Sequence, residues 1–201
     1  MSMLNTCIEQ GLSHPESWGL RTPPVFAALC LAAENNAVIS TYGNPNRPDN
    51  NVQTQIATNQ QLIVNGTFGL RLYSTGSNTN FARMGFDYQF STGRLNINHT
   101  PQGENSAHLS KAEQRLFSKF PDFRVLMLRD LIQVAGLLHV DLTATGALNH
   151  HKVITNAVPL PRFFPGNYIT TQRAQQIIDD PLQEAGFTLQ PDGNWLYPCS
   201  H

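Results

Sequence analysis

Residues 98–110, NHTPQGENSAHLS, combine small polar side chains, one glycine and two histidines between a strand-like run and a helix-like run. If a helix starts near Asn105, its first backbone amides point outward and carry a partial positive charge. Such a terminus can bind an anion, including a pyrophosphate, and small side chains let the ligand approach the backbone. The same residue types also suit a plain strand-to-helix loop in which Asn and Ser cap the helix, so both interpretations remain open.

His99, within this stretch, and histidines at two further places could take part in proton transfer or metal binding. His99 ends the predicted strand, and an imidazole can act as a base near neutral pH. His139 stands just before another predicted strand, and each of these two histidines could equally be a partly buried structural residue. His150 and His151 are adjacent, and neighbours on a strand point to opposite sides, which favours a surface loop over a shared metal. We therefore expect no metal site, and His99 is the candidate catalytic residue.

Cysteine and aspartate are two other residue types that could supply a reactive group. Cys7, Cys30 and Cys199 follow no metal-ligand spacing, and each could be the nucleophile of a Cys–His pair. Cys30 falls in an apolar helix, where thiols are usually inert, and the other two lie near the chain ends. Asp87 falls on the polar face of its predicted strand, where we expect it to be solvated. A cysteine hydrolase is therefore the third of the functional hypotheses below.

The composition limits the classes of partner. Charged residues make up 13% of the chain, about half of the usual share of roughly 25%, and the net charge is -1. Lysine and arginine form no basic stripe, so we expect neither a nucleic acid nor a membrane surface as partner. No apolar run approaches the ~20 residues that span a bilayer, and no signal peptide is visible. The expected localisation is cytoplasmic.

Hydrophobic periodicity predicts one α+β domain over residues 25–201, preceded by an irregular arm at residues 1–24. Residues 24–36 read as a helix and residues 37–43 as a short strand. Asn65-Gly66, between two apolar runs, is typical of a type I′ hairpin turn. Alternation of apolar and polar residues then predicts a four-strand antiparallel meander, whose later strands cover residues 81–90 and 94–99.

Beyond residue 109 the period becomes helical. Residues 110–120 and 123–138 are predicted helices, residues 139–148 a buried strand, and residues 170–187 a helix broken at Pro181 and ended by Gly186. A hairpin around Pro191-Asp192-Gly193 closes the chain. The predicted architecture is a central, mostly antiparallel sheet flanked by helices.

This order of elements resembles the GNAT superfamily of acetyl-coenzyme A-dependent N-acyltransferases over residues 25–197. The family's signature, at the turn from its fourth strand into a helix, is Gln or Arg, two residues, Gly, one residue, then Gly or Ala. The stretch QGENSA aligns with it as Gln102, Asn105 and Ala107, with Asn105 in place of the central glycine. The stretch LQEAGF looks like the family's closing helix end, with Leu182 where the family often has a tyrosine as general acid.

The resemblance implies acetyl-CoA as the cofactor and a small-molecule or peptide amine as the acceptor. Backbone amides near Gly103 would bind the pyrophosphate, and the strand end would hold the thioester and pantetheine. His99 or a water would take the proton of the attacking amine. The cofactor-binding residues so implied are Asn98, Gln102, Gly103, Glu104, Asn105, Ser106 and Ala107.

Three functions follow as hypotheses. The first is an acetyl-CoA-dependent N-acyltransferase-like protein. The second, favoured by the low charge and by Leu182, is a non-catalytic binding or effector module of the same fold with a protein partner. The third is the cysteine hydrolase.

Overall fold

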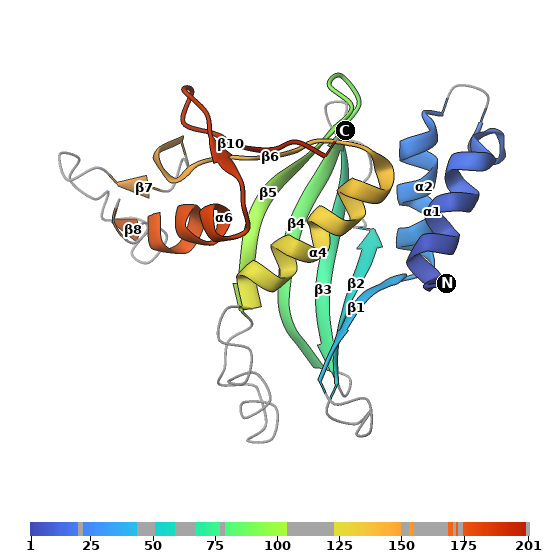
Figure 1. The fold of residues 1–201 in the computed structure, drawn as a ribbon, viewed down its shortest axis with the longest axis horizontal. Helices are drawn as coiled ribbons and strands as arrows, with labels where there is room; N and C mark the ends of the chain where they lie inside the picture. The colour runs from blue at the N-terminus through green and yellow to red at the C-terminus, as the bar shows by residue number, and fades with distance from the viewer. Residues whose placement is uncertain are drawn as a thin grey trace, which may run out of the picture.

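The structure, a computed structural model, describes residues 1–19, 22–43, 51–58, 67–76, 79–103, 123–149, 153–154, 169–170, 172 and 175–199. Figure 1 shows how the helices and strands are arranged. In chain order the elements are α1 (Met3–Ser13), η1 (Pro15–Trp18), α2 (Pro24–Glu34), β1 (Val38–Tyr42), β2 (Val52–Thr58), β3 (Thr67–Gly76), β4 (Thr79–Gln89), β5 (Arg94–Gly103), α4 (Phe123–Leu138), β6 (Leu142–Ala144), η4 (Ala147–Asn149), β7 (Val153–Ile154), β8 (Ile169–Thr170), η5 (Gln175–Asp179), α6 (Asp180–Glu184), β9 (Thr188–Leu189) and β10 (Trp195–Tyr197).

Among the described residues, eight strands form one sheet in the order β1-β2-β3-β4-β5-β6-β10-β9. Neighbouring strands are antiparallel throughout, except that β5 and β6 run parallel. Strands β7 and β8 form a separate parallel pair. The predicted α+β class with a mostly antiparallel sheet is confirmed.

The meander exists because apolar residues alternate along its strands. On β4, the side chains of Ala82, Met84, Phe86 and Tyr88 are all buried, and Leu95 and Ile97 of β5 are buried on the same side. The strand that precedes β3 in the sheet is Val52–Thr58, which was not predicted, and its residues Val52, Thr54 and Ile56 point inward. The apolar run before Asn65, which was expected to be the first strand of the meander, lies outside the described residues. Asn65-Gly66, the predicted hairpin turn, lies outside the described residues.

The N-terminal residues are not the irregular arm that was predicted. Ser2 caps α1, because its Oγ accepts a hydrogen bond from the Asn5 backbone N–H at 3.2 Å. Leu4, Cys7 and Ile8 of this helix belong to the same buried cluster as the sheet residues. The apolar face that these side chains form at helical spacing is what joins the segment to the domain.

The helices lie against the apolar side of the sheet. In Figure 1, α4 crosses the strands β3, β4 and β5, while α1 and α2 lie side by side near β1 and β2. Buried residues of α4, such as Met127, Leu128 and Leu131, join the core with the sheet residues. The predicted helix over residues 123–138 is therefore confirmed, whereas residues 110–120 lie outside the described part of the chain.

In the C-terminal part, the predicted helix end and closing hairpin are present, but the predicted helix and the predicted strand differ in extent. The predicted helix over residues 170–187 is described as a π-helical turn followed by α6, whose first turn holds Pro181. Gly186, with φ 98°, ends this helix, and Gly193, with φ 82°, lies in the turn of the closing β9–β10 hairpin. The predicted strand over residues 139–148 is much shorter, because only Leu142–Ala144 pair in the sheet.

Candidate functional site

The parallel strands β5 and β6 separate near the middle of the sheet. Their pairing covers Leu95 with Leu142, Asn96 with Thr143 and Ile97 with Ala144. Beyond Ala144 the chain leaves the sheet, whereas β5 continues to Gly103 paired with β4. From residue 99 to residue 103, β4 is the one described strand that pairs with β5. Within the described part of the chain, the end of β5 is therefore an edge with which no second strand pairs.

The separated part of β5 is irregular. Phe86 faces Ile97 and Gly85 faces His99, so Asn98 is an extra residue on β5, which is a β-bulge. A second shift in register follows between Gly85 and Arg83. Bulges bend a strand and re-aim its residues, and they are frequent next to active sites. This second shift accommodates Pro101, which has no backbone N–H to donate to the ladder.

A buried carboxylate lies on the polar face of the sheet beside the bulge. Asp87 of β4 is 7% exposed. Its Oδ1 accepts hydrogen bonds from the side-chain amides of Asn96, at 3.3 Å, and Asn98, at 3.1 Å. Burial raises the pKa of Asp87 above its usual value, and the two amides partly offset this. The expectation that Asp87 is solvated is wrong, because β5 supplies the two amides that cover it.

These contacts continue across β5 to β6. The Thr143 hydroxyl donates to Asn96 Oδ1 at 3.1 Å, while Asn96 Nδ2 points to Asp87. Each end of the Asn96 amide therefore has a defined partner, which fixes its orientation. A continuous line of polar contacts joins Thr143 on β6 to Asp87 on β4.

A hollow lies next to this line of contacts, between β5, β6, β10 and the β9–β10 turn. Its volume is about 590 Å³, within the usual range for ligand pockets of roughly 300–1,000 Å³. Most of its polar lining is uncharged. The lining residues are Arg94, Asn96, Thr143, Ala144, Thr145, Gln190, Pro191, Asp192, Asn194, Trp195 and Leu196.

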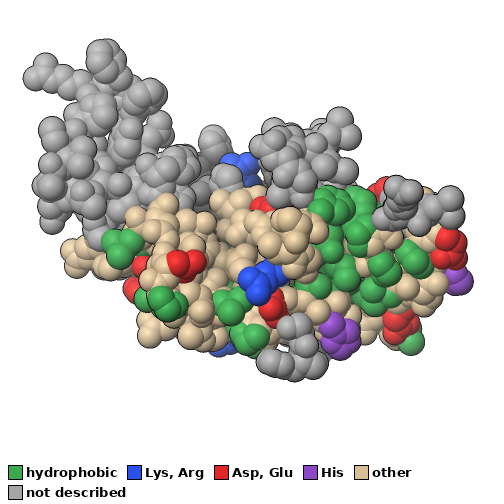
Figure 2. Space-filling model, turned by 90° about the horizontal axis from the view of Figure 1, so that it is seen from above, with side chains coloured by type: hydrophobic (Ala, Val, Ile, Leu, Met, Phe, Trp, Pro, Cys, Tyr) green, Lys and Arg blue, Asp and Glu red, His purple; other side chains and the backbone are tan. Residues whose placement is uncertain are grey.

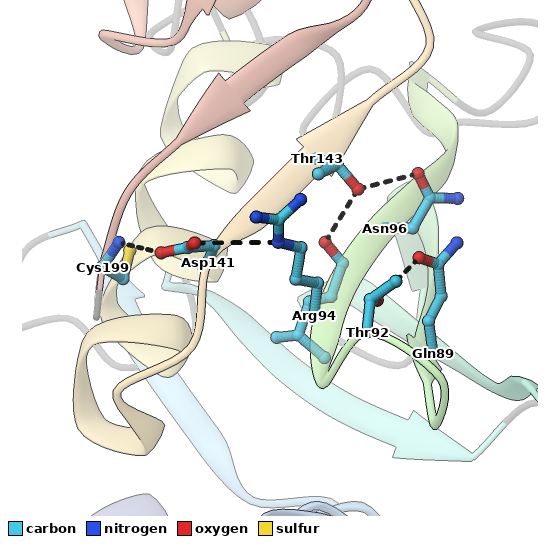
Figure 3. A network of polar contacts seen from close by, with 8 residues as sticks. Gln89, Thr92, Arg94, Asn96, Asp141, Thr143 and Cys199 are labelled. Atoms are coloured by element: carbon cyan, nitrogen blue, oxygen red, sulfur yellow. Dashed lines mark hydrogen bonds and ion pairs between the residues drawn. The ribbon is translucent and has the colours of Figure 1, made fainter.

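Figure 3 shows the polar contacts at the start of β5, where Arg94, Asn96 and Thr143 border the hollow. The Arg94 guanidinium lies between the side chains of Asp141 and Thr143, and its Nε is 3.7 Å from Asp141 Oδ2. The other oxygen of Asp141 accepts a hydrogen bond from the backbone N–H of Cys199 at 3.0 Å. Asp141 thus joins the C-terminal segment to the strand pair that borders the hollow.

The turn on the opposite side of the hollow is held rigidly. Asp192 accepts hydrogen bonds from the backbone N–H and the side-chain amide of Asn194, at 2.9 and 3.0 Å. Asn149 donates to the Asp192 carbonyl at 2.8 Å and to Asn194 Oδ1 at 3.1 Å. A side chain at Gly146 would meet the Gly193 carbonyl oxygen at 2.0 Å, so the turn packs directly on the backbone that follows β6.

No family model, no curated protein and no solved structure matches the chain.

The predicted site residues divide into two groups. Asn98, His99, Gln102 and Gly103 lie on β5, whereas Glu104, Asn105, Ser106 and Ala107 lie outside the described residues. The prediction ended the strand at His99. It was wrong because pairing with β4 continues through the two shifts in register as far as Gly103. Gln102 and Gly103 are thus strand residues and not part of a turn.

The other histidine and metal candidates give no site in the described part of the chain. His139 is exposed and has φ 55°, directly after the last residue of α4. Its backbone N–H donates to the Gly136 carbonyl, as expected for the residue that ends a helix. His150 and His151 lie outside the described residues, and the described residues hold no cluster of metal-ligating side chains. None of the helices described is long and apolar enough to cross a membrane.

The environments of the three cysteines raise their pKa values and so make the thiols poor nucleophiles. Burial raises the pKa of Cys7. Burial, and to a lesser extent the charge of Glu34, raises the pKa of Cys30 to about 12. Burial and the charge of Asp141 raise the pKa of Cys199 to about 11. Catalytic cysteines need a lowered pKa, so these environments disfavour the hydrolase hypothesis.

Sequence reasoning considered Asp87 only as a solvated residue, and it did not single out Asn96, Thr143 or Arg94. One signal in the sequence could have indicated Asp87. Aspartate is depleted within strands, so an aspartate in the middle of an alternating strand suggests a hydrogen-bonding partner on a neighbouring strand. The partners themselves depend on register. A shift of one residue between β4 and β5 would have turned Asn96 to the other face.

Proposed function

We propose that this chain is an acetyl-CoA-dependent N-acyltransferase-like protein that transfers an acyl group to an amine. The observation that supports the proposal is the separation of β5 from β6 after Ile97 and Ala144. This separation lies in β5, whose last two residues, Gln102 and Gly103, begin QGENSA, the stretch that resembles the family's cofactor loop.

The backbone of β5 suits an extended polar ligand. A strand whose edge is open on one side can hydrogen-bond a chain laid along it, as in peptide recognition by strand addition. The described part of β5 between His99 and Gly103 would hold the pantetheine arm in this way. Pro101 cannot donate, so the donors there are the backbone N–H groups of its neighbours. When bound, acetyl-CoA supplies the acyl group as an activated thioester.

Two side-chain groups are proposed to manage the proton of the amine. His99 lies on the bulged strand and is the first candidate base. Asp87 is the second, because burial raises its pKa and so makes the carboxylate a stronger base than an exposed one. Leu182, at the position of the family's tyrosine, is fully buried and has no proton to give. The departing thiolate would therefore be protonated by solvent.

Ligand-dependent thermal stability tests this proposal. A ligand present at about 100 times its dissociation constant should add about 2.7 kcal/mol to the free energy of unfolding. We expect acetyl-CoA and coenzyme A to raise the melting temperature, and ADP, which lacks the pantetheine arm, to raise it less. The absence of any shift at millimolar acetyl-CoA would refute the proposal.

The same open edge supports a second candidate, a non-catalytic module that binds an extended peptide along β5. The buried Leu182 favours it, since the family's acid is missing. Acetyl-CoA distinguishes the two functions, because only the first requires the cofactor. A protein that ignores acetyl-CoA but is stabilised by a strand-forming peptide would be the binding module.

A further inference from the structure

The hollow between β5, β6 and β10 carries opposite charges on its two borders. Of its described lining residues, Arg94 is the one cation and Asp192 the one anion, and uncharged amides and hydroxyls line the space between them. The geometry points to a binding site for a small zwitterion, a free amino acid or a short peptide, whose carboxylate contacts Arg94 and whose ammonium contacts Asp192. Figure 2 shows that charged side chains cover only a small part of the described surface on this face.

Arg94 retains most of its binding capacity. A guanidinium has five N–H donors, and charge-assisted hydrogen bonds to carboxylates are about 2.7–2.9 Å long. The contact of Arg94 with Asp141 uses Nε alone and is longer, at 3.7 Å. The side chain is 45% exposed, and no hydrogen bond joins it to another described residue. Its two terminal nitrogens are therefore available to a ligand carboxylate in the paired geometry that arginine favours.

Asp192 is a fixed anion. Hydrogen bonds from the backbone N–H and the side-chain amide of Asn194 lower the pKa of Asp192, so the carboxylate stays ionised at neutral pH. Because Asn149 holds both residues of the turn, the carboxylate keeps its place without a ligand. A site that is already in position loses little entropy on binding.

The space between the two charges is arranged for hydrogen bonding. Asn96 and Thr143 are oriented by their mutual contact and by Asp87. Trp195 is 6% exposed, and its indole N–H donates to Asp179 at 2.9 Å. The described lining of the hollow therefore offers no open aromatic face of the kind that a sugar or a base would stack on. If the bound zwitterion is also the acyl acceptor, its amino group is the amine that is acylated. That part of the inference rests on the proposed function.

Direct binding, measured without acetyl-CoA, tests the inference. The probes are free amino acids and the dipeptides Gly-Gly and Ala-Ala, each compared with its C-terminal amide and its N-acetyl derivative by NMR titration. We expect the zwitterions to shift the signals of Arg94, Thr143 and Asn194. Loss of a charge-assisted contact corresponds to roughly tenfold to hundredfold weaker binding, so each blocked probe should bind that much more weakly. Stronger binding by the amino acids or by the dipeptides identifies the source of the zwitterion.

Variants assign the two charges. In Arg94→Met the preference for a free carboxylate should disappear, and in Asp192→Asn the preference for a free amine should disappear. Arg83→Met is the matched control, because Arg83 is exposed on β4 and does not line the hollow. Its preferences should equal those of the unaltered protein. Arg94→Lys should keep part of the carboxylate preference, which separates charge from folding.

The outcomes distinguish this inference from the proposed function. Zwitterion binding with no response to acetyl-CoA would support the zwitterion site and contradict the acyltransferase function. A response to acetyl-CoA with no binding of any zwitterion would support the acyltransferase function and contradict the zwitterion site. Equal binding of the blocked and unblocked probes, or unchanged preferences in Arg94→Met, would overturn the inference.

Discussion

Ile97 of β5 pairs with Ala144 of β6, and this is the last pair between the two strands. The strands separate there because β6 ends in the backbone turn around Gly146, whereas β4 continues to pair with β5. The carboxylate of Asp87 and the hollow near Arg94 both lie beside this point. One feature of the sheet thus brings together the polar residues on which the functional proposals depend.

Two Gly→Ala changes should have opposite effects on stability, because Gly11 lies at the close crossing of α1 and α2 whereas Gly136 faces open space. A Cβ at Gly11 would lie 2.2 Å from the Ala28 Cα, so the helices would have to move apart. Gly11→Ala should lower the free energy of unfolding by about 1–3 kcal/mol, as expected for overpacking. Gly136, within α4, has open space, and Gly136→Ala should raise the free energy of unfolding by about 0.5–1 kcal/mol. Urea denaturation measures the free energy of unfolding of both variants. Equal changes in the two variants would contradict the close packing of α1 against α2 at Gly11.

Asp130 joins α4 to β1, so its removal should lower the free energy of unfolding by a large amount. Its buried Oδ1 accepts hydrogen bonds from Ser40 Oγ at 2.6 Å and Tyr42 Oη at 2.7 Å. Asp130→Ala removes the acceptor of both hydroxyls, and we expect a loss of about 2–4 kcal/mol in the free energy of unfolding. Arg129→Ala, an exposed change on the same helix, is the control and should shift it by no more than about 0.5 kcal/mol. Similar losses in both variants would contradict the assigned role.

The same carboxyl predicts a pH dependence. Burial raises the pKa of Asp130, and the Ser40, Tyr42 and Thr54 hydroxyls partly oppose this. Between the unfolded value of about 3.9 and the raised folded value, the folded state therefore binds more protons than the unfolded state. Stability from this group is complete below the unfolded value and is lost as the pH rises through the folded value.

A comparison with Asp130→Asn isolates that contribution, because the other titrating groups, including Asp87, are common to both proteins. The free energy of unfolding of the unaltered protein minus that of Asp130→Asn should decrease as the pH rises above about 4. Thermal or urea unfolding across the acidic range measures the difference. A difference that is constant or increases with pH would show that the folded pKa is not raised.

The raised pKa values of the thiols predict slow labelling of the native protein. With a pKa of about 11, Cys199 should be about one part in a thousand thiolate at pH 8, against about a quarter for an ordinary cysteine. Cys30, with a pKa of about 12 and a buried side chain, should react more slowly still. Labelling with a disulfide reagent, followed with and without urea, checks both. Rapid labelling of one native thiol would restore the cysteine hydrolase as a candidate.

Local patterns predicted most of the elements because each reflects residues close in the chain. The alternation in residues 81–90 marks β4, and the apolar run in residues 123–138 marks α4. The β2 strand was missed although Val52, Thr54 and Ile56 alternate with glutamines. Threonine at the central inward position weakens the apolar signal, and its burial is decided by the neighbouring strands and helices.

The candidate site was predicted only in part. The strand that leads into QGENSA was placed correctly, because its apolar residues Leu95 and Ile97 alternate with polar ones. Its end was wrong, since a proline in the sequence suggests a break in pairing. In the structure, pairing with β4 resumes beyond the bulge, and a bulge depends on contacts with the partner strand.

The sequence by itself determined the α+β class, the central meander, the helix of residues 123–138 and the closing hairpin, because hydrophobic period and turn residues act over a few neighbours. Only the tertiary structure decided that β5 pairs in parallel with β6, that Asp87 is covered by Asn96 and Asn98, and that Arg94 and Asp192 border one hollow. These relations join residues far apart in the chain. They depend on strand order and register, which the packing of the whole core selects.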